Sequence, residues 1–413
     1  MMSPWQFVEE IKGLSDKNIS TEHLWFNAAN NGDIETLRTL YSGKNVDINA
    51  RYKHGSTAAR NGSAPCVQFL LGAKANIDVK NRYDASAVMV AASEGNLECL
   101  KLLIEARGNV DVKTEDGLTA LIVATRKGHP ECVRLLLDAK ADIEAQKRGG
   151  LTVLMLAAKS RQNECVRVLI DAKANVDAGI GAGGTALSYA VVNGNDVGAK
   201  LLVEAKADFN TPDKYRYYPL IEVIQGSRHR KCLRVLIEAK VDVNVKDRDD
   251  IPVIVSSVTE PSDLTQLLLL GKANVDARDK HGLTALMYAA ENGRNTHVQV
   301  LVDAKANLDV QANTDGATAF MLAVRQSGFE FSMVNVQLLV AARADPALQD
   351  HNGMTALMWA IKEGDIAYVR LLLDPDVTLE LPTERGLKRR YHDIDNEDEY
   401  EYEDHDYDED MDE

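Results

Sequence analysis

Turn-forming and apolar residues recur along this 413-residue chain with a period near 33 residues. In the clearest copy, Asp116-Gly117 is typical of a turn, and the Thr119 hydroxyl can cap a helix by accepting from a free N–H of its first turn. Leu121 and Ala124 then fall on one helical face, before Gly128 interrupts the pattern. This spacing predicts a turn and a short first helix that starts after residue 119.

A second apolar face follows at Cys132, Leu135 and Leu136, so each repeat is expected to contain a second helix. All five cysteines hold the same position in this second helix: Cys66, Cys99, Cys132, Cys165 and Cys232. The first four are 33 residues apart, and the 67-residue gap to Cys232 places a missing member at Gly198. Stacked helices lie about 10 Å apart, whereas a disulfide needs Cα atoms within about 7 Å. We therefore expect five unpaired thiols that serve as small buried apolar groups.

The first half of the repeat recurs at 150–154, 183–187, 282–286, 316–320 and 353–357, each time with Gly and Thr two residues apart. With the Gly-His step and the leucine run of the second helix, this pattern resembles that of the ankyrin-repeat family. The resemblance implies an all-α ankyrin-repeat solenoid, in which each repeat is a β-turn plus an antiparallel helix pair. We expect about eleven repeats over residues 20–380, a helical N-terminal cap segment at 1–19 and a disordered acidic tail at 381–413.

Three repeats depart from the pattern. The segment from Gly55 to Cys66 is four residues shorter than its counterpart, which predicts a truncated first helix. At 250–257, β-branched residues replace the usual helix start and predict a soft joint. Between Thr318 and Val336, four extra residues carry Phe329 and Phe331.

The second helix of family members usually ends at a glycine in the left-handed conformation. Here basic residues hold that position: Lys74, Arg107, Lys140, Lys173, Lys206, Lys240, Lys272, Lys305 and Arg343. Each should cost about 1 kcal/mol as a non-glycine, and a cation at a helix C-terminus recovers about 0.3–1 kcal/mol. The preferred interpretation is helix capping, with nearby Asp residues neutralising the charge. The alternative is a basic stripe that meets an acidic partner or the acidic tail.

The net charge of −16 is concentrated in the tail, because residues 393–413 contain 14 Asp and Glu and no Lys or Arg. The rest of the chain is nearly neutral, and such a tail would repel nucleic acid. Unpaired cysteines favour a reducing compartment, and the N-terminus has no secretory signal pattern. No apolar run is long enough for a membrane span. We predict a cytoplasmic protein, with Lys388-Arg389-Arg390 as a weak signal for nuclear import.

Catalytic motifs are not recognisable, so no enzyme activity, cofactor or resident metal is predicted. His129 with Cys132 and His229 with Cys232 have the i, i+3 spacing of zinc ligands. The two pairs lie three repeats apart, and the histidines match the Gly-His step of the family. A structural role is therefore preferred over zinc binding.

Ankyrin arrays bind partners on a concave face made of turn tips and the ends of the first helices, as the resemblance implies. On this chain, that face would include Arg126, Lys127, Lys159, His281, Arg325, Gln326 and His351. One turn is unusual because it carries Tyr215, Arg216, Tyr217 and Tyr218. Tyr and Arg dominate binding energy at interfaces, so this turn is a candidate hot spot. Its alternative role is to repack a turn that lacks glycine.

The resulting functional prediction is a non-catalytic scaffold or adaptor that binds other proteins, with no nucleic-acid or membrane partner, and that is monomeric by itself. The alternative is a substrate-recruiting or regulatory subunit of an enzyme complex, such as a ubiquitin ligase or a phosphatase. The sequence does not identify the partner, because the repeat fixes the frame rather than the ligand.

Overall fold

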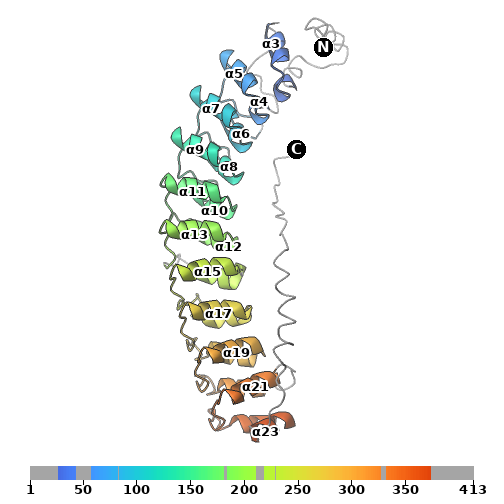
Figure 1. Ribbon diagram of the computed structural model, residues 1–413, viewed down its shortest axis with the longest axis vertical. Coiled ribbons are helices and arrows are strands. Elements are labelled where there is room, and N and C mark those ends of the chain that lie inside the picture. The colour runs from blue at the N-terminus through green and yellow to red at the C-terminus, as the bar shows by residue number, and fades with distance from the viewer. Residues whose placement is uncertain are drawn as a thin grey trace, which may run out of the picture. The chain divides into compact units, whose positions relative to one another are not determined.

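The computed structural model describes residues 27–42, 57–81, 83–180, 184–210, 218–227, 229–326 and 332–373. The predicted cap segment, the acidic tail, Tyr215 to Tyr217, Phe329 and Phe331 lie outside these residues. The chain forms two bodies, an N-terminal body (Met1–Asp208) and a C-terminal body (Phe209–Glu413). Each body is a stack of helix pairs, in which an inner helix is followed by an outer helix (Figure 1).

The helices of the N-terminal body are α3 (Ile34–Ser42), α4 (Thr57–Arg60), α5 (Ala64–Gly72), α6 (Ala87–Ser93), α7 (Leu97–Glu105), α8 (Ala120–Arg126), α9 (Pro130–Asp138), α10 (Val153–Lys159), α11 (Asn163–Asp171), α12 (Ala186–Val192) and α13 (Asp196–Glu204). Those of the C-terminal body are α14 (Pro219–Glu222), α15 (Arg230–Glu238), α16 (Val253–Ser256), α17 (Ser262–Leu270), α18 (Ala285–Glu291), α19 (Asn295–Asp303), α20 (Ala319–Arg325), α21 (Ser332–Ala341), α22 (Ala356–Lys362) and α23 (Ile366–Leu373). The described residues contain no β-strand beyond two isolated bridges. The predicted all-α fold is confirmed.

The inner helices start at a hydroxyl cap. The Thr119 Oγ1 accepts from the Ile122 N–H at 3.3 Å, as predicted from the sequence. Equivalent caps start the other regular inner helices, at Ser86, Thr152, Thr185, Thr284, Thr318 and Thr355. Because this cap satisfies one of the free N–H groups of a helix start, seven-residue helices can begin at a fixed place in each repeat.

The cysteines are all buried and free, which confirms their expected role in the core. Gly198 is buried at the same position of α13, where the cysteine pattern breaks. There the Asn195 side chain accepts from the Gly198 N–H and donates to the Ala158 carbonyl of the preceding repeat, at 2.8 and 3.0 Å. A β-carbon on Gly198 would lie 2.3 Å from the Asn195 Nδ2. The missing cysteine thus makes room for an amide that caps its own helix as well as joining two repeats.

The outer helices end as predicted, because all nine basic residues have a positive φ between 63° and 68°. At Lys140, the backbone N–H donates to the Leu137 carbonyl, and the Ala141 N–H donates to the Leu136 carbonyl. These two bonds form the left-handed helix end that glycine usually makes. All nine side chains are exposed, and none has a carboxylate within 4 Å in the described part of the chain. The expected neutralisation by Asp therefore does not take the form of ion pairs there.

The nearby acidic and amide side chains bond to the backbone instead. Two residues after Lys140, the Asp142 N–H donates to the Asp111 carboxylate of the preceding repeat at 3.0 Å. The Asp142 carboxylate in turn accepts from the Glu144 N–H. The same inter-repeat bond recurs within each body, with acceptors Asp78, Glu144, Asp177, Asn210, Asn244, Asp276 and Asp309. This series of bonds, here called the inter-repeat ladder, fixes the spacing of neighbouring repeats.

Among the helices named above, three inner helices are shorter than the seven residues of the regular ones. The truncated helix predicted before Cys66 is α4, which has four residues. In the C-terminal body, α14 has four residues and continues as a π-helix over Val223–Ser227, and α16 has four residues and continues as a 3₁₀-helix over Ser257–Thr259. Neither Tyr218 nor Pro252, at their N-caps, makes a side-chain capping bond. The irregularity predicted at 250–257 is present.

Candidate protein-binding surface

Five basic residues of two adjacent repeats define a basic cluster in the N-terminal body: Arg126, Lys127, Lys147, Arg148 and Lys159. Arg126 ends α8, Lys127 is the residue that caps it, and Lys159 ends α10. Lys147 and Arg148 lie in the turn that leads into α10, which Gly149 and Gly150 complete with positive φ angles. Arg126, Lys127 and Lys159 were predicted from the sequence as binding residues.

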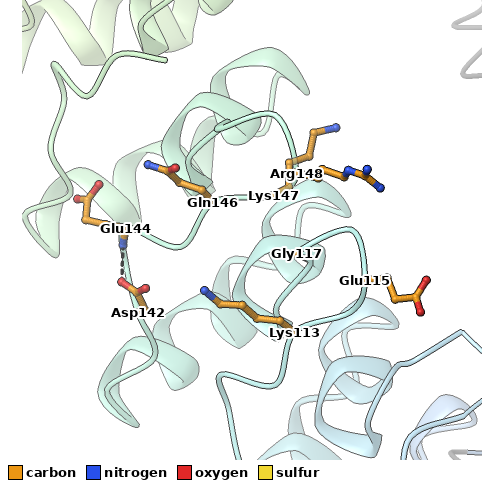
Figure 2. Close-up of a pocket in the computed structure, with 8 residues that line it drawn as sticks. All are labelled: Lys113, Glu115, Gly117, Asp142, Glu144, Gln146, Lys147 and Arg148. Atoms are coloured by element: carbon orange, nitrogen blue, oxygen red, sulfur yellow. Dashed lines mark hydrogen bonds between the residues drawn. The ribbon is translucent and has the colours of Figure 1, made fainter. Parts of the chain in front are cut away.

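The two successive turns beside this cluster enclose an open depression of about 520 Å³ (Figure 2). Its lining is polar and combines both charges: Lys113, Glu115, Gly117, Asp142, Glu144, Gln146, Lys147 and Arg148. The Arg148 N–H donates to the Asp116 carbonyl, which locks one turn tip against the next. The Glu144 side chain accepts from the Asn175 N–H, as part of the inter-repeat ladder. The depression is therefore rigidly framed by backbone bonds, while its cations stay available.

Electrostatics link the members of the cluster. Burial lowers the pKa of Lys147, and the nearby charges of Arg126 and Lys159 lower it further, against an opposing effect of Asp116. Thus Arg126 and Lys159 lie near enough to repel the Lys147 ammonium. Within the described residues, none of the five cations has a carboxylate within 4 Å. Cations held together without ion-pair partners attract acidic groups of a partner.

Arg325, another predicted binding residue, is already engaged within the C-terminal body. Its guanidinium contacts the Asp315 carboxylate at 2.5 Å and the fully buried Asp350 carboxylate at 2.8 Å. It also stacks on the Trp359 ring, 4.1 Å from the ring centre, and Lys362 lies over the same ring at 4.2 Å. Arg325 therefore joins α20 to the following repeat, a role that sequence reasoning did not assign to it.

Asp350 organises the turn that precedes α22. Burial would raise its pKa, but the N–H groups of Met354 and Asn352, the Trp359 indole and the Arg325 charge hold the pKa below its usual value. Asp279 has the same place in the turn that precedes α18, where its carboxylate accepts from the His281 and Leu283 N–H groups and the Tyr288 hydroxyl. Each of these aspartates thus stabilises its turn by accepting hydrogen bonds from the N–H groups of that turn.

The remaining predicted residues are spread over several repeats. His281 and His351 are exposed at turn tips, and Gln326 follows α20 and is half-buried. Tyr218 is half-buried at the start of α14, whereas Tyr215, Arg216 and Tyr217 lie outside the described residues. The structure thus brings Arg126, Lys127 and Lys159 together and leaves the others apart.

Lys147 and Arg148 were missed by the sequence reasoning. The signal was present, because they precede Gly149-Gly150 at the turn-tip positions of their repeat. Only the fold shows that Lys147 lies beside the ends of α8 and α10.

Other site types find little support among the described residues. No group of three or more His, Cys, Asp or Glu is arranged to hold a metal ion there. The Nε2 of His129 lies 2.9 Å from the Ser93 carbonyl of the preceding repeat, so this histidine has a structural contact. No helix of that part of the chain is long and apolar enough to cross a bilayer.

Most of the chain matches sequence models of known protein families. Sequence models of ankyrin repeats in three copies match residues 24–114, 56–147, 88–180, 154–247 and 253–335, and a model of many ankyrin copies matches 329–373. The chain belongs to the ankyrin-repeat family. Ankyrin repeats are generally modules for protein–protein interaction, and no catalytic domain is indicated.

Similar curated proteins match parts of this chain. The chicken (Gallus gallus) nuclear factor NF-kappa-B p105 subunit is 30% identical over 170 residues, which cover 38% of this chain and 17% of that protein. The ankyrin repeat, SAM and basic leucine zipper domain-containing protein 1 of Saimiri boliviensis boliviensis is 35% identical over 100 residues, covering 24% and 20%. Inversin of Canis lupus familiaris is 29% identical over 146 residues, covering 34% and 13%. The chain thus spans a fifth or less of each of these relatives.

Proposed function

We propose that this ankyrin array is a non-catalytic scaffold or adaptor of the cytoplasm, which binds an acidic segment of a partner protein at the basic cluster. The observation that carries the proposal is the set of five cations in two adjacent repeats, none of which has a carboxylate within 4 Å in the described residues. Its support is physical: a rigid frame costs little entropy on binding, and the clustered charge raises the association rate.

The proposal distinguishes the basic cluster from the tyrosine-rich turn. Tyr218 is half-buried at a helix start, while the cluster residues other than Lys147 are exposed. We therefore place the main contact at the cluster and treat Tyr215, Arg216 and Tyr217 as a second contact to be tested by the double variant Tyr215→Ala/Tyr217→Ala. A loss of partner affinity without a change in melting temperature would support that second contact.

The decisive experiment uses charge reversal. The full-length Arg126→Glu/Lys159→Glu variant is expected to lose the partners that wild-type protein retains from native lysate, as measured by quantitative mass spectrometry. The matched control is Lys101→Glu/Lys200→Glu, which makes the same charge change on the exposed sides of α7 and α13. Equal partner sets for all three proteins would contradict the proposal. A stable set of subunits from one enzyme would point to the subunit role instead.

A further inference from the structure

The last described repeat of the C-terminal body has an apolar face that no described residue covers. Ile361 on α22 is 60% exposed, and Met358 is 45% exposed. Ile361 stands six residues after the capping Thr355. In the other regular repeats the residue at this position is 0% exposed: Ala92, Thr125, Ala158, Val191, Ala290 and Val324.

The cause of that burial is the next inner helix. Each inner helix packs against the one that follows it, as α18 does against α20 and α20 against α22. Met321, the counterpart of Met358 on α20, is 1% exposed because α22 covers that face. The α22 face therefore keeps the composition of an internal repeat, whereas a terminal repeat needs a polar outer face. Leu373, at the end of α23 in the same repeat, is also exposed, at 66%.

The sequence after residue 373 carries part of the pattern of one more repeat. After the helix-end position at Asp376, Val377, Leu381 and Gly386-Leu387 follow with the spacing that Ala141, Ala145 and Gly150-Leu151 have after Lys140. This is the pattern of the turn that opens a repeat.

An inner helix would have to follow Leu387, but Arg390 and Asp393 replace the residues that match Leu154 and Ala157. Residues 388–413 contain only two aliphatic side chains, Ile394 and Met411. Residues 374–413 thus carry the sequence pattern of a turn, but not the apolar pattern of an inner helix that would cover α22.

We propose that the end face formed by Met358 and Ile361 takes an amphipathic helix from a partner protein, which packs on α22 as α22 packs on α20. The partner helix carries a stripe of small and medium apolar residues, as the inner helices of this chain do. Its outer side is basic, because residues 393–413 bring 14 carboxylates close along the chain. A second copy of this chain fits less well, since it would bring two such acidic segments together.

The test uses full-length protein and a fluorescent synthetic helix of about 18 residues, long enough to be helical, with a Leu and Ala stripe and lysine elsewhere. Fluorescence anisotropy should show binding that Met358→Glu/Ile361→Glu weakens at least about tenfold. The matched control is Leu270→Glu, because Leu270 is 75% exposed on α17, outside this face. That control should bind like wild type.

These variants should fold as stably as wild type, because the substituted side chains are already exposed. Equal melting temperatures in thermal unfolding would confirm this. Equal binding by wild type and Met358→Glu/Ile361→Glu would overturn the proposal. So would a wild-type dimer in sedimentation equilibrium that the Glu variant converts to monomer, since a second copy would then be the occupant. Binding only after deletion of residues 374–413 would also overturn it, by showing that the chain covers its own end face.

Discussion

Single residues of this chain show how a repeat that lacks the recurring cysteine can gain a helix cap. At Gly198 the absent side chain leaves room for Asn195 to bond both its own helix and the Ala158 carbonyl. At Cys99, the preceding Asn96 bonds the Ala59 and Arg60 carbonyls but makes no cap to its own helix. With glycine at position 198, the asparagine three residues earlier caps its own helix. With cysteine at position 99, the equivalent asparagine does not.

Gly198→Cys, which restores the cysteine spacing, should destabilise the protein. The new β-carbon would displace the Asn195 amide and leave buried polar groups unpaired, at a cost of about 1–3 kcal/mol. Urea unfolding measures the loss. In Asn195→Ala the same substitution at 198 should cost much less, because the displaced group is already absent. An equal cost in both backgrounds would show that Asn195 is not the reason for the glycine.

The buried thiols should make the protein less stable in alkali. Burial, with a smaller effect of the adjacent Glu131 or Glu164, raises the pKa of Cys132 and Cys165 to about 11. In the unfolded chain these thiols lose their protons first, so the unfolded state binds fewer protons and stability falls as pH rises through this window. Urea midpoints at about pH 8 and about pH 10 should show the fall. The Cys132→Ala/Cys165→Ala variant should show a smaller one, and an unchanged fall would refute the cause.

Arg325→Ala should be costly because it leaves the fully buried Asp350 carboxylate with one partner fewer. We expect a loss of about 2–3 kcal/mol in the free energy of unfolding at neutral pH. The pKa of Asp350 is lowered in the folded state, so this stabilisation is present near neutrality and is lost as pH falls. Urea unfolding should therefore show the gap between wild type and variant narrowing in acid. The control Arg134→Ala removes an exposed pair with Glu131 and should have little effect.

At the scale of elements, the helix ends followed from the sequence more completely than the contacts between repeats. The left-handed position lies at a fixed distance from the apolar positions of the outer helix, so all nine basic residues could be identified in advance. Lys147 beside Arg126 and Lys159, and Arg325 with Asp350 and Trp359, join residues of different turns and helices. Such groupings depend on side-chain directions between stacked repeats, which the period of the sequence does not encode.

The basic helix ends trade backbone strain against charge, and two substitutions separate these effects. Lys140→Ala keeps the positive φ and loses the cation, so it should be destabilising by about 0.3–1 kcal/mol. Lys140→Gly also loses the cation but removes the strain, so it should exceed the alanine variant in stability by about 1 kcal/mol. Thermal or urea unfolding of both proteins gives the comparison. An alanine variant as stable as the glycine variant would mean that this conformation carries no strain.

At the scale of the whole molecule, stability should be uneven within the C-terminal body. The inner helices that start at Pro219 and Val253 are short, lack a side-chain cap and end in π or 3₁₀ turns. We expect faster amide hydrogen exchange over 219–227 and 253–259 than over α18 and α20. Pro252→Thr supplies the hydroxyl found at Thr284, and should slow exchange over 253–259. Exchange as slow as in α18 in the wild type would contradict this.

The inter-repeat ladder has a consequence for how the gene for such a protein can change length. The Asn175 N–H bonds the Glu144 side chain, and the Asp142 N–H bonds that of Asp111, across 31 residues in each case. Loss of residues 112–144 by unequal recombination would bring Asp111 to the place of Glu144, where it could accept the same N–H group. Only deletions or duplications of whole periods preserve the bond, so recombination within the array is filtered toward whole repeats. Because of the ladder, a change in the number of whole repeats is the change in length that this protein tolerates best.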